Sequence, residues 1–169
     1  MRTRLAGWSL ITLLVSVGIA PGARAQESEH GEAGHEYHPN HFSFFIGITD
    51  GGNAEGVGEE NASPTLGLDY ERQLSRRFGV GFLADVAAGD RREFVAGIPL
   101  VLHAGRSAKI YVAPGIERSK ETGHDETMVR LGFMWSFSVG RMTLSPALNV
   151  DFVNGERIYV PGLNVGWGF

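Results

Sequence analysis

The chain has 169 residues, 24 of them Gly and none of them Cys. This length suits one domain or two small ones, and the absence of Cys excludes a disulfide framework. The formal net charge of −4 argues against a nucleic-acid partner, which would require a basic face.

Residues 1–25 have the pattern of a secretory signal peptide. Two Arg residues precede an apolar run over residues 5–20, and Ala23-Arg24-Ala25 matches a small-x-small cleavage site. A transmembrane anchor is the alternative, but the run is short for the ~20 residues that a spanning helix needs. Cleavage before Gln26 removes three Arg and no acid, which leaves 12 Lys and Arg against 19 Asp and Glu and a net charge of −7.

Residues 26–40 form a His- and Glu-rich segment with almost no apolar content, which predicts a flexible tail. Its histidines, with one just beyond it, are His30, His35, His38 and His41. Imidazole and carboxylate ligands suit Zn, Cu or Ni, so weak divalent metal binding is one interpretation. A hydrophilic spacer is the other, because nothing in the pattern fixes a coordination geometry.

From residue 41 to residue 169, apolar residues recur with a period of two rather than 3.6, which predicts strands. Eight such segments follow one another: 41–49, 65–74, 78–87, 94–103, 108–117, 127–139, 142–152 and 158–169. One face of each carries large apolar residues, such as Phe133, Trp135 and Phe137, and the other carries small or polar ones. If the barrel were soluble, its small and polar face would be exposed to water, and a water-exposed face with so few Lys is unusual. We therefore expect the apolar faces to meet lipid and the small and polar residues to fill a narrow interior.

The connections between these segments alternate between short and longer. The longer ones include two acidic stretches, Asp50–Pro64 and Arg118–Glu126. The short ones contain four Arg and no acid: Arg76, Arg77, Arg106 and Arg141. Transmembrane barrels have short turns on the periplasmic side and longer loops outside. An even number of strands also returns the carboxyl end to the side of the tail, so both observations predict periplasmic short turns.

The signal peptide, the eight alternating strands and the ending Val165-Gly166-Trp167-Gly168-Phe169 resemble small bacterial outer-membrane β-barrel proteins over residues 41–169. The resemblance implies an all-β fold, an eight-stranded antiparallel up-and-down transmembrane β-barrel, monomeric and surrounded by outer-membrane lipid. Phe169, Trp167 and Val165 resemble the family's assembly signal, which the barrel-assembly machinery reads. The family contains attachment proteins, structural anchors, small-solute channels and a few enzymes, so the resemblance leaves the activity open.

The strand pattern places one cation, Arg130, in the interior together with five acids: Asp69, Glu71, Asp85, Glu117 and Asp151. We expect a charge-assisted hydrogen-bond cluster that plugs the lumen, with Arg72, His103 or water helping to neutralise the acids. A small-solute channel or a ligand-binding barrel around Arg130 is the first alternative. A soluble, lipocalin-like periplasmic binder is the second.

Six aromatic residues fall on the predicted outward faces and indicate interfacial girdles: Phe42, Tyr70, Trp135, Phe152, Tyr159 and Trp167. Four prolines inside the strands predict bulges or strand ends: Pro99, Pro114, Pro146 and Pro161. No serine-hydrolase elbow, zinc-protease motif, phosphate loop or dinucleotide fingerprint is present. We therefore expect a non-enzymatic protein without a cofactor, with a structural or interaction role and acidic extracellular loops.

Overall fold

The computed structural model describes residues 39–51, 62–88, 93–119 and 123–169 of the chain. The regular structure in these ranges is β-strand. No helix in the described ranges is long and apolar enough to cross a membrane. The predicted signal peptide and nearly all of the predicted tail lie outside the described residues.

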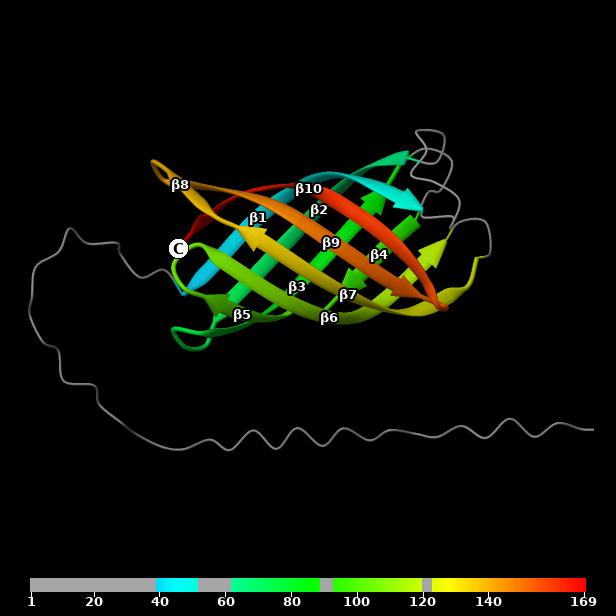
Figure 1. The fold of residues 1–169 in the computed structure, drawn as a ribbon, viewed down its shortest axis with the longest axis horizontal. Coiled ribbons are helices and arrows are strands. Elements are labelled where there is room, and N and C mark those ends of the chain that lie inside the picture. Colours follow the sequence, from blue (N-terminus) through cyan, green and yellow to red (C-terminus); the bar gives the residue numbers. More distant parts are fainter. Residues whose placement is uncertain (1–38, 52–61, 89–92, 120–122) are drawn as a thin grey trace, which may run out of the picture. The chain divides into compact units, whose positions relative to one another are not determined.

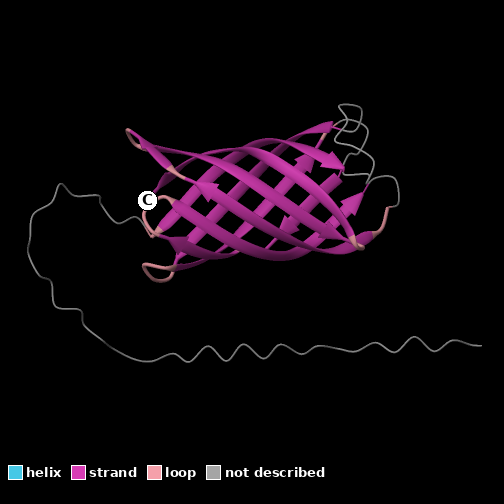
Figure 2. Ribbon diagram, viewed as in Figure 1, coloured by secondary structure: helices cyan, strands magenta, loops and turns pink. Residues whose placement is uncertain are grey.

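Ten strand segments follow one another along the chain. They are β1 (Asn40–Gly51), β2 (Ala62–Gln73), β3 (Phe78–Ala87), β4 (Glu93–Gly97), β5 (Leu100–Ala104), β6 (Ala108–Ser119), β7 (Asp125–Trp135), β8 (Phe137–Val139), β9 (Met142–Val153) and β10 (Glu156–Gly168). β4 and β5 are two parts of one strand, because both pair with β3 on one side and β6 on the other. β7 and β8 likewise pair with β9, so the described residues form eight strands (Figure 2).

Every neighbouring pair of strands is antiparallel and consecutive in sequence, and β1 pairs with β10 to close the sheet into a barrel. The closing register runs from His41 opposite Gly168 to Gly51 opposite Ile158. β1 therefore begins and β10 ends at one rim, called here the terminal rim, beside the turns at residues 74–77, 105–107 and 140–141 (Figure 1). The opposite rim, which carries the remaining connections, is called the loop rim. The predicted up-and-down topology is confirmed.

The outer surface of the barrel is apolar. Phe133 and Trp135 are 45% and 46% exposed, whereas Asp85 and Arg130 are 3% and 2% exposed. Large apolar residues are exposed in the same way on the other strands, for example Ile46 on β1 and Leu66 on β2. Monomeric soluble proteins rarely expose a continuous apolar surface of this size, which indicates contact with a membrane. The predicted orientation of the two faces is confirmed.

The interior is more apolar than the sequence pattern predicted. Phe45, Leu83, Met128 and Val160 are among its most deeply buried side chains, and they belong to a cluster that lines much of the barrel. Each points inward because it lies an even number of residues from an interior polar residue of the same strand, and such residues share one face. Residues related in this way are said below to have the same parity. Part of the space assigned to small and polar residues is therefore filled by hydrocarbon.

The prediction that prolines mark bulges or strand ends is correct at one position and wrong at three. Pro99 lies at the break between β4 and β5, where its carbonyl accepts a hydrogen bond from Gly81 N at 3.0 Å. Pro114, Pro146 and Pro161 lie within continuous strands, and their side chains are exposed on the outer face. Each of these prolines lacks a backbone N–H donor, but the strand that contains it stays paired with its neighbours before and after the proline.

Outward aromatic residues form a row at the terminal rim. Phe42 on β1 is opposite Tyr70 on β2 and Trp167 on β10. The rings of Phe42 and Trp167 are 5.4 Å apart between centroids, and those of Phe42 and Phe44 are 5.3 Å apart in an edge-to-face arrangement. Tyr70 donates a hydrogen bond to Asn40 Oδ1 at 2.9 Å. An amphipathic ring with its polar end at the rim suits a membrane–water interface.

Two interior aromatic rings lie directly against glycines of neighbouring strands. The Phe45 ring covers Gly162, and the Tyr111 ring covers Gly132 so closely that a β-carbon there would collide with it. Tyr111 and Gly132 are partners in the β6–β7 ladder. Glycine at these positions makes room for large rings in a narrow barrel.

We predict that Gly132→Ala lowers the free energy of unfolding by about 1–3 kcal/mol, because the added methyl group overpacks the interior against Tyr111. Urea unfolding in detergent, followed by tryptophan fluorescence, measures the change. The double variant Tyr111→Ala with Gly132→Ala should lose less unfolding free energy than the sum of the losses in the two single variants. Additive effects would contradict the proposed collision.

Candidate functional site

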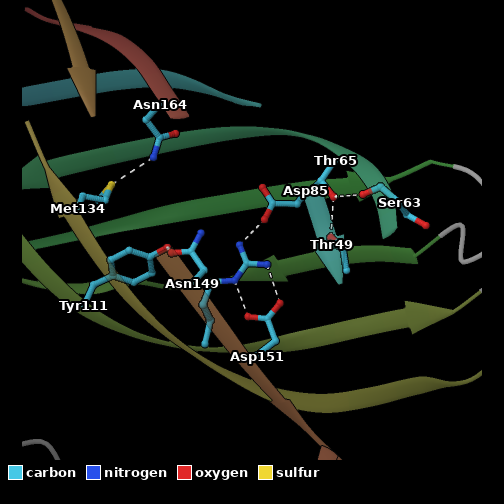
Figure 3. A network of polar contacts seen from close by, with 10 residues as sticks. Thr49, Ser63, Thr65, Asp85, Tyr111, Met134, Asn149, Asp151 and Asn164 are labelled. Atoms are coloured by element: carbon cyan, nitrogen blue, oxygen red, sulfur yellow. Dashed lines mark hydrogen bonds and ion pairs between the residues drawn. The ribbon is translucent and has the colours of Figure 1, made fainter. Parts of the chain in front are cut away.

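A buried ion-pair cluster surrounds Arg130 in the interior of the barrel, and Figure 3 shows its partners Asp85 and Asp151. Arg130 on β7 donates through Nε and Nη2 to Asp151 Oδ1 and Oδ2 on β9, at 2.6 and 2.8 Å. Its Nη1 donates to Asp85 Oδ2 on β3. The two-pronged geometry with Asp151 is the strong, orientation-specific form of an Arg–carboxylate pair.

This cluster crosses the full width of the barrel. Arg130 and Asp151 are direct partners in the β7–β9 ladder, whereas β3 is separated from β9 by three intervening strands in either direction around the barrel. Through Arg130, the cluster therefore links Asp151 and Asp85 on opposite walls of the barrel.

A second polar contact lies beside the Arg130 cluster. Tyr111 on β6 donates a hydrogen bond to Asn149 Oδ1 on β9 at 2.7 Å, and both residues are buried. Figure 3 shows the Tyr111 ring reaching from its strand toward Asn149. The contact joins two strands that are separated by β7.

Glu71 anchors a separate cluster nearer the terminal rim. His103 Nε2 lies 2.5 Å from Glu71 Oε1, and Lys109 Nζ donates to Glu71 Oε2 at 2.7 Å. Glu71 is on β2, His103 on β5 and Lys109 on β6, so this contact also crosses the interior. The five acids are thus divided between at least two cations rather than gathered around Arg130.

Two small cavities lie in the interior formed by the described residues. The larger, about 30 Å³, lies toward the terminal rim, and its polar lining includes His41, Asp69, Lys109 and Asn164. The smaller, about 10 Å³, is lined by Arg130 and both of its Asp partners. At roughly 10–15 Å³ per water molecule, they have room for about two waters and one water. Neither has the size of a pocket for an organic ligand, which is typically hundreds of Å³.

The remaining predicted interior acids are Asp69 and Glu117. Asp69 lines the larger cavity, and Glu117 is buried beside the smaller one, near the loop rim. Arg72, which was expected to help neutralise the acids, is instead exposed, because it has the outward parity of Tyr70. His103 does take part, as a partner of Glu71.

The predicted metal ligands are only partly within the described residues. His30, His35 and His38 lie outside them, so the structure places none of the three. His41 lies on β1 and lines the larger cavity. The described residues contain no group of three or more His, Asp or Glu side chains that could hold a metal ion. Metal binding by the tail stays a prediction.

The predicted assembly-signal residues lie at the end of the closing strand. Val165 and Trp167 point outward, and Phe169 is exposed just beyond β10. Phe169 N donates to Asn40 O at 2.9 Å, so the backbone at this end is joined to the start of β1. Recognition by the assembly machinery stays a prediction.

Sequence reasoning missed Lys109 and Tyr111 as interior polar residues. A signal for both was present, since they lie an even number of residues from Glu117 in the same strand. Asn149 and Asn164 do lie on the polar faces assigned to the interior, and both are buried. Their partners were not visible in the sequence, because they lie on strands that are not adjacent.

No family model matches this chain, and neither does any curated protein. Solved structures do match it. The outer-membrane protein Ail of Yersinia pestis in a phospholipid bilayer nanodisc has a TM-score of 0.52 at 12% identity, over 77% of this chain and 99% of that one. The structure of Ail in complex with the heparin analogue sucrose octasulfate has a TM-score of 0.53 at 10% identity, over 77% of this chain and 96% of that one. A de novo designed transmembrane β-barrel has a TM-score of 0.52 at 8% identity, over 79% of this chain and 98% of that one.

The fold is that of a small outer-membrane β-barrel. The predicted fold class and the predicted resemblance are therefore confirmed, at identities so low that they establish the fold alone. The shared fold and the apolar exterior together support the predicted outer-membrane location.

We predict that Arg130→Met lowers the free energy of unfolding by about 3–5 kcal/mol, because it leaves two buried carboxylates without their cation. Urea unfolding midpoints in detergent measure the loss. Arg118→Met is the matched control, since Arg118 and Asp125 form an exposed pair that should contribute little. Adding Asp85→Asn and Asp151→Asn to Arg130→Met should restore part of the loss. Equal midpoints for the two single variants would contradict the assignment.

Proposed function

We propose that the chain is an outer-membrane barrel with a structural and interaction role, without catalytic activity, a cofactor or an open channel. The observation that carries the proposal is the bridge from Asp85 through Arg130 to Asp151, which joins opposite walls inside an apolar exterior. An exterior of this kind suits outer-membrane lipid, and a bridged interior suits a plug.

The plug is supported by how the described interior is filled. The Arg130 cluster, the Tyr111–Asn149 contact and the Glu71 cluster follow one another from mid-height toward the terminal rim. The two cavities beside these contacts have room for about one or two water molecules each. A hydrated solute would have to displace at least one of these contacts.

Interaction is assigned to the loop rim. The connection Asp50–Pro64 carries four acids and no Lys or Arg, although most of it lies outside the described residues. We propose that it faces outward and suits a cation-bearing partner. The Ail structure holds a heparin analogue, which is polyanionic. An acidic loop would repel such a ligand, so that ligand is not transferred to this chain.

The same proposal covers the oligomeric state of the barrel and its assembly into the membrane. The β1–β10 closure leaves no unpaired sheet edge along most of the barrel, which favours a monomer. The outward residues Val165, Trp167 and Phe169 end the last strand, and we propose that the barrel-assembly machinery reads them.

The second candidate function is a narrow channel. It is favoured by the two cavities, one lined by Tyr111 and the other by Arg130 and its Asp partners. Opening would require Arg130 to leave Asp85, and the buried pair opposes this. A soluble lipocalin-like binder is disfavoured, because its apolar residues would point inward.

We expect the protein to migrate faster on a gel when unheated than when boiled, and to remain in the membrane fraction after carbonate extraction. A closed barrel stays compact in detergent until heat breaks its continuous ladder. Recovery in the soluble periplasmic fraction would contradict the membrane assignment.

We also expect no conductance steps from the wild-type protein in planar bilayers. The double variant Arg130→Ala with Tyr111→Ala removes both central contacts and should produce steps, if it keeps its heat-modifiable mobility. The matched control is Arg118→Ala at the loop rim, which should stay silent. Steps from the wild type that disappear when Arg130 alone is changed would support the channel instead.

A further inference from the structure

The terminal rim carries a cluster of exposed arginines with few acids near it. The cluster is called here the arginine rim and consists of Arg72, Arg76, Arg77, Arg106 and Arg141. These residues come from the end of β2 and from the three turns of this rim, so they are distributed around it. Within the described residues, none of the five guanidinium groups forms an ion pair or a side-chain hydrogen bond.

The acids closest to this rim are not available to the arginines. Asp69 lines the interior cavity, and Glu71 is bound to His103 and Lys109 inside the barrel. The exposed acids among the described residues, Asp125 and Glu156, lie at the loop rim. A chain with a net negative charge therefore presents a positive surface at one end.

Exposed apolar side chains alternate with these arginines. Leu74, between Arg72 and Arg76, is 64% exposed in its turn. Val139 and Met142 flank the turn that holds Arg141, on the hairpin of β8 and β9. Apolar groups directly beside cations match the layer of a bilayer where acyl chains meet headgroups.

We propose that the arginine rim binds anionic phospholipid headgroups of the leaflet that surrounds the terminal rim. A guanidinium group pairs with a phosphate oxygen through two parallel hydrogen bonds, and a net negative headgroup adds a favourable long-range attraction. The leaflet around this rim would be enriched in phosphatidylglycerol relative to a zwitterionic phospholipid. This inference rests on the proposed membrane location and adds the class of lipid.

Two tryptophans make the rim directly observable. Trp135 and Trp167 are exposed on the outer face at the terminal rim. The third, Trp8, lies in the predicted signal peptide and can be removed as Trp8→Phe in the full chain. Quenching by brominated phospholipids in reconstituted vesicles then reports the lipids that contact this rim.

We expect brominated phosphatidylglycerol to quench more than brominated phosphatidylcholine at equal mole fraction, with a preference of roughly threefold or more at low salt. The ratio of quenching by the two lipids should fall toward one in about 0.5 M NaCl, where the screening length is about 4 Å. Replacing all five arginines by Gln should also abolish the preference. The pair Arg76→Gln with Arg77→Gln should reduce it partly, in case the fivefold variant does not fold.

The control variant is Arg118→Gln with Arg157→Gln, which removes two exposed cations at the loop rim and should leave the preference unchanged. Equal quenching by both lipids in the wild type, or a full preference in the fivefold variant, would overturn the proposal. A preference that appears only when Glu27, Glu29, Glu32 and Glu36 are changed to Gln would mean that the acids of the predicted tail, and not lipid headgroups, neutralise the arginine rim. That result would also overturn the proposal. Absence of quenching by either lipid would instead refute the membrane location.

Discussion

The structure depends on closure of a single hydrogen-bonded ladder. In hydrocarbon no water can satisfy a free backbone N–H or C=O group, so a spanning sheet must have no open edges. The pairing of β1 with β10 meets this requirement. It also brings the two ends of the barrel chain to one rim, where Asn40 and Phe169 exchange backbone hydrogen bonds. The division into a terminal rim with short turns and a loop rim follows from that closure.

Closure with eight strands leaves a narrow interior, and the side chains inside it must satisfy one another. Arg130 is tolerated because two carboxylates on different walls bind it, and Glu71 is tolerated because His103 and Lys109 do the same nearer the terminal rim. The glycine at position 132 gives the Tyr111 ring its space. Packing and charge neutralisation thus fill the same small volume, which is why the cavities that remain are only the size of a few waters.

The fold was predictable from the sequence because the side-chain period of a strand is local. Phe133 and Trp135 identify the outer face without knowledge of any partner strand. The interior contacts were not predictable in the same way. Whether Arg130 reaches Asp85 depends on the barrel radius and on the register summed over several ladders, and neither is encoded in one segment. Parity alone placed Glu71 inside, but it could not show that Lys109, three strands away around the barrel, would be its partner.

These constraints also locate where recognition can occur. The outer wall is occupied by apolar residues that suit lipid, and the interior polar groups at the centre are bound to one another. Among the described residues, exposed charge is therefore concentrated at the two rims. Arg141 and its neighbours make the terminal rim basic, whereas the loop rim carries both signs, with Arg118 and Arg157 as well as Asp125 and Glu156. The two ends of the barrel therefore differ in charge, and it is at these ends that charged side chains are open to contact from outside.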